Sequence, residues 1–154
     1  MEFRQQYDLV KSSRKVLLNY CGTLPDETFL ARHPAFGRGC IRGLLVHNLN
    51  AYEWWIGAHA LGSDSAITDN EAVLNLRQII RAFETTDAMV GRFCERYTAD
   101  SFAAVPASLG EKQFMSTPIE LFTHAITHEF HHKGQLLWLT RLLGHVPADT
   151  DIIR

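Results

Sequence analysis

The sequence lacks the features that define several large classes of protein. No segment approaches the roughly 18 consecutive apolar residues of a membrane-spanning helix, and residues 1–15 hold no apolar run of signal-peptide length. Lysine and arginine total 15 against 17 aspartate and glutamate residues, and neither sign forms a run. We therefore expect a cytoplasmic protein that binds neither membranes nor a nucleic-acid backbone.

Cysteine is scarce, and linkers and repeats are missing. Cys21, Cys40 and Cys94 are odd in number, widely spaced and form no Cys-x-x-Cys pair, so we expect reduced, mostly buried thiols rather than reactive ones. No repeat or Pro/Gly-rich stretch divides the 154 residues, of which 46% are hydrophobic. These properties predict a single domain over residues 1–154 with a sizeable core.

Apolar residues recur at steps of three and four in four long stretches, which is the period of an amphipathic helix. Thr117, Pro118 and Glu120 form a capping box with proline at the first helical position, so the last helix has a clear start. Thr68 to Glu71 has a similar capping spacing and predicts the start of the third helix. The predicted helices cover residues 2–21, 41–61, 68–97 and 118–144.

Residues 98–116 lack helical periodicity. Within them, residues 102–105 and 113–115 flank Gly110 and could pair as a short hairpin. The predicted fold is all-α, an antiparallel four-helix bundle with an irregular connection before the last helix.

Histidine is abundant: the chain has eight, and four fall between residues 124 and 132. On the last predicted helix, the inward stripe contains His128, His132 and Gln135, and burying such groups is unfavourable unless each finds a partner. Histidines four apart on a helix have Cβ atoms about 5–6 Å apart and can share a metal ion. His47 lies on the inward stripe of the second helix and would be a third ligand. Three protein nitrogens leave coordination positions open for water or substrate.

The same residues contain a second motif. Residues 128–132 read His-Glu-Phe-His-His and fit H-E-x-x-H, the zinc-peptidase signature in which the glutamate activates water. The extended form of that motif needs glycine and histidine where this chain has Gln135 and Trp138. Only 22 residues follow His132, which leaves little room for a downstream ligand. A zinc peptidase is therefore the lesser alternative.

Two stretches of the sequence resemble the DinB/YfiT-like superfamily: residues 41–47 with Glu53-Trp54-Trp55, and residues 128–135 with Arg141-Leu142-Leu143-Gly144. The resemblance covers nearly the whole chain. It implies a four-helix bundle, commonly a homodimer, with a divalent ion such as zinc or nickel held by His47, His128 and His132. It further implies thiol-dependent transfer or isomerisation, or hydrolysis, of a small-molecule substrate.

Three further residues are candidates for catalytic roles. Asp87 interrupts an apolar stripe and could be a general base near the metal, or else an aspartate bonded to a neighbouring helix. Glu129 follows a ligand and could act on bound water, but it could equally point to the side of the bundle. Gln135, one turn past His132, could hydrogen-bond a ligand or the substrate.

The sequence favours a metal-dependent enzyme, with thiol-dependent transfer slightly ahead of hydrolysis and a low-molecular-weight thiol as a partner. A different class stays open: a non-catalytic metal-binding or interaction bundle. In that case a fourth protein ligand, His124, Asp87 or His131, would close the coordination shell. The aromatic residues near these motifs are interpreted as packing rather than as a substrate box: Tyr52, Trp54, Trp55, Phe130 and Trp138.

Overall fold

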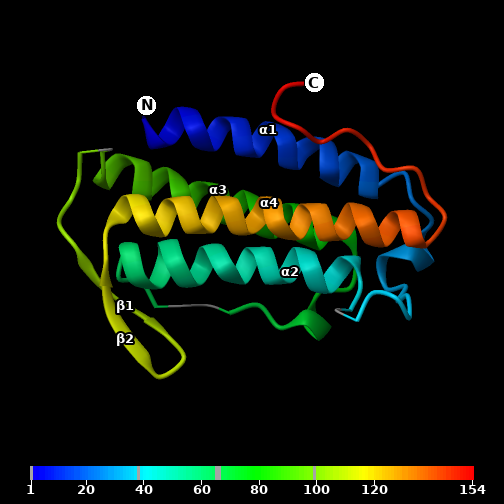
Figure 1. The fold of residues 1–154 in the computed structure, drawn as a ribbon, viewed down its shortest axis with the longest axis horizontal. Helices are drawn as coiled ribbons and strands as arrows, with labels where there is room; N and C mark the ends of the chain where they lie inside the picture. Colours follow the sequence, from blue (N-terminus) through cyan, green and yellow to red (C-terminus); the bar gives the residue numbers. More distant parts are fainter. Residues whose placement is uncertain (1, 38, 65–66, 99) are drawn as a thin grey trace.

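The computed structural model describes residues 2–37, 39–64, 67–98 and 100–154, and these residues are mostly helical (Figure 1). The four longest elements lie side by side and are joined by shorter ones. The helices are α1 (Phe3–Cys21), α2 (Ile41–Tyr52) continued by the π-helical η2 (Glu53–Ala60), α3 (Leu76–Arg96) and α4 (Pro118–Leu142). Two short 3-10 helices, η1 (Asp26–Phe29) and η3 (Asn70–Ala72), and two strands, β1 (Val105–Leu109) and β2 (Lys112–Ser116), complete the elements.

The packing of the helix ends gives the direction of each helix. One apolar cluster joins the beginning of α1 to η2, to the end of α3 and to the beginning of α4. The other joins the end of α1 to the beginnings of α2 and α3 and to the end of α4. Helices α1 and α4 therefore run in one direction and α2 and α3 in the other, as the colours of Figure 1 show.

The predicted antiparallel arrangement was thus wrong for the pair α2 and α3, which run parallel. The connection between them returns to the other end of the molecule before α3 begins (Figure 1). The connection has 15 residues, 61–75, and a chain of that length spans at most roughly 50 Å when fully extended. That reach exceeds the length of about 30 Å of the 20-residue helical segment, residues 41–60, that the connection must pass.

The start of α4 confirms the predicted capping box. The side chain of Thr117 accepts a hydrogen bond from the Glu120 backbone N–H, and the Glu120 carboxylate accepts one from the Thr117 N–H at 2.7 Å. Pro118 occupies the first helical position. The helix ends at Leu142, and Gly144 follows with φ of 88°, a conformation that terminates helices and favours glycine.

Helix α3 begins later than its predicted start at residue 68. Asp69 does cap a turn, since its carboxylate accepts a hydrogen bond from the Glu71 N–H at 3.0 Å, but that turn is only η3. The cap of α3 is Asn75, whose side-chain oxygen accepts from the Gln78 N–H at 3.1 Å. A capping spacing marks a local turn, and a long helix need not follow it.

The predicted hairpin is present, with its first strand displaced toward the turn. Strands β1 and β2 pair antiparallel with Ala107 opposite Phe114, and Gly110 turns between them with φ of 59°. The hairpin is attached to η2, because the Trp54 indole N–H donates to the Ser108 carbonyl at 3.0 Å. Residue 99 of the predicted connection lies outside the described residues.

The π-helical winding of η2 changes which side chains the second helix buries. A stripe of three- and four-residue steps from His47 through Ala51 predicts Trp54 as the next inward residue, whereas the structure leaves Trp54 half-buried and buries Trp55 and Ile56. A π turn holds one more residue than an α turn, so the stripe moves by one position. Gly57 allows the close approach of α3, since a Cβ there would lie 2.9 Å from the Met89 sulfur.

We predict that Thr117→Ala lowers the free energy of unfolding by about 1 kcal/mol, because the helix loses its N-cap. Urea denaturation followed by circular dichroism measures the change. Thr123→Ala, at an exposed position inside α4, is the matched control and should leave stability unchanged or slightly higher. Equal urea midpoints for the two variants would contradict the prediction.

Candidate metal centre

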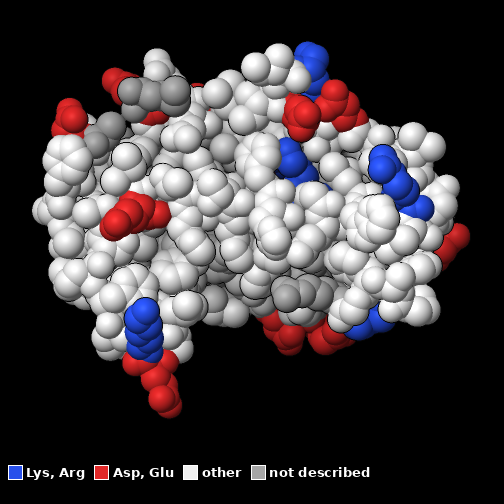
Figure 2. Space-filling model, in the orientation of Figure 1, with Lys and Arg blue, Asp and Glu red and all other residues white. Residues whose placement is uncertain are grey.

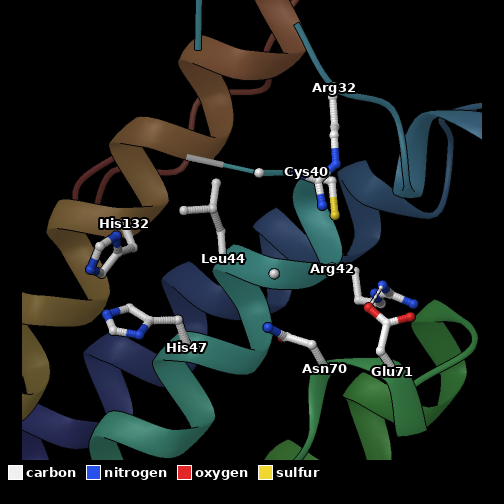
Figure 3. A pocket seen from close by; sticks show the side chains of 10 residues that line it. Arg32, Cys40, Arg42, Leu44, His47, Asn70, Glu71 and His132 are labelled. Atoms are coloured by element: carbon white, nitrogen blue, oxygen red, sulfur yellow. Dashed lines mark hydrogen bonds and ion pairs between the residues drawn. The ribbon is translucent and has the colours of Figure 1, made fainter. Parts of the chain in front are cut away.

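The structure brings the three predicted ligand histidines together across the seam between α2 and α4. The His47 ring centroid lies 4.8 Å from that of His128 and 4.5 Å from that of His132. The rings of His128 and His132, one turn apart on α4, are 4.4 Å apart. Figure 3 shows His47 and His132 pointing toward one another from their two helices.

This donor set fits a divalent ion. Ligand nitrogens of the three histidines all lie within 4.8 Å of one another, and Nε2 of His47 is 2.9 Å from Nε2 of His128. Three nitrogens about 2.1 Å from a tetrahedral zinc ion would be about 3.4 Å apart, which lies between those two values. Imidazole nitrogens suit zinc and nickel, so this group could hold either ion.

Gln135 contacts the metal-ligand candidate that is most buried. Its Oε1 lies 2.8 Å from Nδ1 of His132, and its Nε2 lies 3.0 Å from Nε2 of His131. When Nδ1 of His132 donates to this amide oxygen, Nε2 keeps its lone pair for a metal. Gln135 therefore sits where a residue that orients a metal ligand would be.

The electrostatic surroundings keep His128 neutral. Its pKa is lowered to about 4, first by partial burial and then by the neighbouring imidazoles of His132 and His47. A metal binds the neutral imidazole, because a proton would occupy the lone pair. His128 is thus in the metal-binding form across the neutral pH range.

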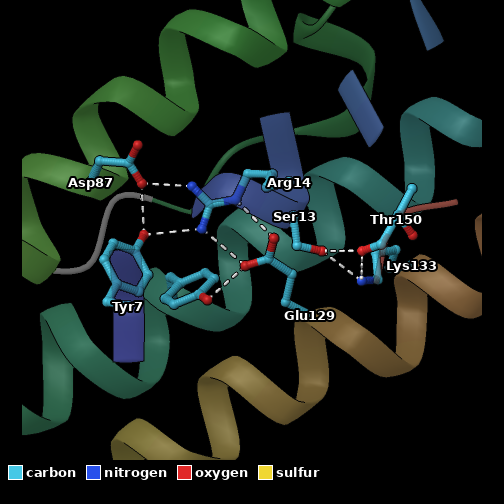
Figure 4. Close-up of polar contacts among 8 residues, drawn as sticks. Tyr7, Ser13, Arg14, Asp87, Glu129, Lys133 and Thr150 are labelled. Atoms are coloured by element: carbon cyan, nitrogen blue, oxygen red, sulfur yellow. Dashed lines mark hydrogen bonds and ion pairs between the residues drawn. The ribbon is translucent and has the colours of Figure 1, made fainter. Parts of the chain in front are cut away.

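Glu129 points away from the three histidines, toward the interior of the molecule. Its two carboxylate oxygens accept hydrogen bonds from Nε and Nη2 of Arg14 at 2.8 and 2.9 Å, and Tyr52 donates to Oε2 at 2.6 Å. Successive residues of a helix are rotated by about 100°, so Glu129 leaves α4 on a different side from His128. The structure therefore places Glu129 as in the alternative interpretation, at the side of the bundle, where Arg14 and Tyr52 donate hydrogen bonds to its carboxylate. Figure 4 shows Glu129 and Arg14 pointing toward one another.

Asp87 belongs to the same buried network. Its Oδ1 accepts from Nη1 of Arg14 at 2.6 Å and from the Tyr7 hydroxyl at 2.7 Å (Figure 4). Asp87 is thus bonded to the neighbouring helix α1, as in the alternative interpretation of this residue. Burial acts to lower the pKa of Arg14, but the Glu129 carboxylate outweighs it and raises that pKa above its ordinary value.

Arg14 is not among the residues predicted for the site, although the sequence contains a signal for it. Tyr7, Val10, Leu17 and Cys21 mark an inward stripe, and Arg14 occupies the step between Val10 and Leu17. The structure leaves the Arg14 side chain only 3% exposed. A charged residue on an inward stripe indicates a buried partner of opposite charge, which here is Glu129.

A cavity of about 300 Å³ adjoins the histidines. His47 and His132 form one end, and Arg32, Cys40 and Arg42 lie toward the other (Figure 3). Arg42 is paired with Glu71 at 2.6 Å on the rim. The volume is at the lower end of the range for small-molecule sites, about 300–1,000 Å³.

The fold and the site together define a class: a mainly helical protein with a candidate three-histidine metal centre beside a small-molecule cavity. The family model described as DinB family matches residues 2–154, so the chain belongs to the DinB family. No curated protein sequence gives a significant match. Among the described residues, no helix has the length and apolar character needed to cross a membrane.

We predict that Arg14→Met lowers the free energy of unfolding by about 3–5 kcal/mol, because it leaves the Glu129 carboxylate buried without its charged partner. Urea denaturation measures this change. Arg4→Met is the matched control, because the Arg4–Glu95 pair is exposed and exposed pairs contribute about 0–1 kcal/mol. The prediction fails if the two variants lose the same stability.

Proposed function

We propose that this DinB-family chain is a divalent-metal-dependent enzyme that acts on small molecules. His47, His128 and His132 would hold zinc or nickel. The observation that carries the proposal is the grouping of three imidazoles from two helices at the end of a cavity. When bound, the ion would lower the pKa of a thiol or a water in its open positions.

Within this proposal we favour thiol-dependent transfer over hydrolysis. In the transfer, the sulfur of a low-molecular-weight thiol would form a bond to an electrophilic carbon of the substrate, and the leaving group would depart with the bonding electron pair. A thiolate is itself the nucleophile and needs no further proton transfer. The two carboxylates predicted for proton transfer, Asp87 and Glu129, are both bound to Arg14, and this favours a reaction that does not need them.

Residues around the three histidines would orient a metal ligand and supply charge to the cavity. Gln135 would keep His132 in the tautomer that presents Nε2. Arg32 and Arg42 would supply positive charge to the cavity of about 300 Å³ that His47 and His132 border. The peptidase alternative is disfavoured, because its mechanism requires the glutamate of H-E-x-x-H at the metal and Glu129 is bound to Arg14 and Tyr52.

We also propose that the helices form the four-helix bundle of the family and that the chain is a cytoplasmic homodimer. The contacts of α1 and of α2 with both α3 and α4 support the bundle. The family resemblance supports the dimer, and the sequence composition supports the location.

Elemental analysis of untagged protein tests the metal centre. We expect about one zinc or nickel ion per chain in the wild type and a loss of at least 90% in His47→Ala, because that change removes the only ligand that α2 supplies. His47 is exposed, so the variant should fold. His131→Ala, next to His132 but outside the group of three, is the matched control and should keep its metal.

A wild type without metal after incubation with zinc or nickel would refute the metal centre. Loss of metal from His131→Ala, with full metal in His47→Ala, would refute the assignment of ligands.

A rate assay tests the reaction type on metal-loaded protein. With 1-chloro-2,4-dinitrobenzene as electrophile and glutathione or cysteine as thiol, we expect thioether formation at least tenfold faster than with metal-free wild type or His47→Ala. Hydrolysis of 4-nitrophenyl acetate without thiol, in the absence of transfer, would favour a hydrolase. A fully metal-loaded protein that does neither would support the non-catalytic metal-binding alternative.

A further inference from the structure

A second recess borders the same histidines on the side of the β-hairpin. Its volume is about 380 Å³. Its walls include the two tryptophans of η2, the end of β1 and one edge of α4: Trp54, Trp55, Leu109, His124 and His128. His47 lines both this recess and the polar cavity, so the candidate metal centre stands between two spaces of different character.

Contacts behind the recess hold its aromatic wall in place. The Trp54 indole N–H donates to the Ser108 carbonyl at 3.0 Å, and the Trp54 ring meets the His59 ring edge-on at 4.9 Å between centroids. Trp55 meets the ring of His124 at 4.8 Å in the same way. Two indole rings are thus fixed beside the histidines before any ligand arrives, which lowers the entropy cost of binding.

The two spaces differ in charge. None of the described residues that line the recess is lysine, arginine, aspartate or glutamate. The cavity on the other side of His47 is lined by Arg32, Arg42 and Glu71. Figure 2 shows that the face formed by α2 and α4 carries few charged side chains. In the metal-free protein a charged ligand group would find no lysine, arginine, aspartate or glutamate as a counter-ion among the described residues of the recess, whereas a neutral ring would gain contact with indole.

We propose that the recess binds the neutral aromatic part of the substrate, a planar group of one or two rings, and so directs its reactive atom toward the three histidines. This inference rests on the proposed function and gives it a substrate class. The volume lies in the range of small-molecule sites, which sets the size of the group. Trp54 and Trp55 were expected to serve packing alone, and the proposal gives the parts of the two side chains that line the recess a second role.

NMR of the tryptophan indole N–H groups tests the proposal with benzyl alcohol as the probe and benzoate as its charged counterpart. The chain has three tryptophans, and Trp138, 52% exposed and outside the recess, is an internal control. We expect benzyl alcohol to shift the signals of Trp54 and Trp55 saturably and to leave that of Trp138 unchanged. Benzoate should bind at least tenfold more weakly. Equal shifts at all three tryptophans, or equal binding of the two probes, would overturn the proposal.

A pair of variants on the hairpin tests the location. Leu109→Glu removes an apolar wall and adds a charge at a residue that is 62% exposed, so the fold should survive. We expect it to weaken benzyl alcohol binding at least fivefold. Met115→Glu makes a similar change on the same hairpin at a residue that does not line the recess and is 61% exposed; it should bind like the wild type. Equal effects of the two variants would place the probe elsewhere.

These measurements separate the two proposals. They are made on metal-free protein, with the metal content of reloaded Leu109→Glu determined in parallel. Normal metal loading with lost probe binding in Leu109→Glu supports the recess as a separate site. Unaltered probe binding in Leu109→Glu refutes the recess and leaves the metal centre standing. A wild type that takes up no metal refutes the proposed function, whatever the probe does.

Discussion

The buried ion pair between Arg14 and Glu129 is the interaction on which the geometry of the histidines depends. Glu129 is next to His128 in α4, and the hydroxyl of Tyr52, five residues beyond His47, donates to the same carboxylate. One carboxylate therefore connects α1, α2 and α4, and it fixes the rotation of both helices that carry candidate ligands. An ion pair of this kind needs its other hydrogen bonds satisfied to be tolerated in a core, and Tyr7, Tyr52 and Asp87 supply them.

Helix α4 contains two pairs of functional side chains that are each four residues apart. His128 and His132 are four residues apart and face the seam with α2, while Glu129 and Lys133, displaced by one residue, face α1. Lys133 donates to the Ser13 hydroxyl at 2.7 Å and to the Thr150 carbonyl at 2.9 Å, which ties the C-terminal segment to α1. The six consecutive residues 128–133 thus serve both the candidate metal centre and the packing of the molecule.

Two local signals in the sequence predicted the structure well, whereas the capping spacing at residues 68–71 marked only a turn. The capping box at Thr117 and the histidine spacing depend on neighbours within two turns of a helix, so they could be read directly. The role of Glu129 could not, because H-E-x-x-H has the same letters whichever partner the glutamate meets, and its partner Arg14 lies 115 residues away. The parallel direction of α2 and α3 depends on how a long connection is routed, and residue spacing does not record that.

The π-helical winding of η2 separates the second helix into two parts with different tasks. The α-helical part carries His47, and the π-helical part carries the tryptophans of the recess. Each residue of an α-helix adds about 100° of rotation, so removing the extra residue of a π turn would rotate the tryptophans relative to His47 by about that angle. A change of one residue in this segment would therefore exchange the side chains that line the recess and leave the three histidines in place. The segment η2 would then be a joint where the proposed substrate preference could change independently of the candidate metal centre.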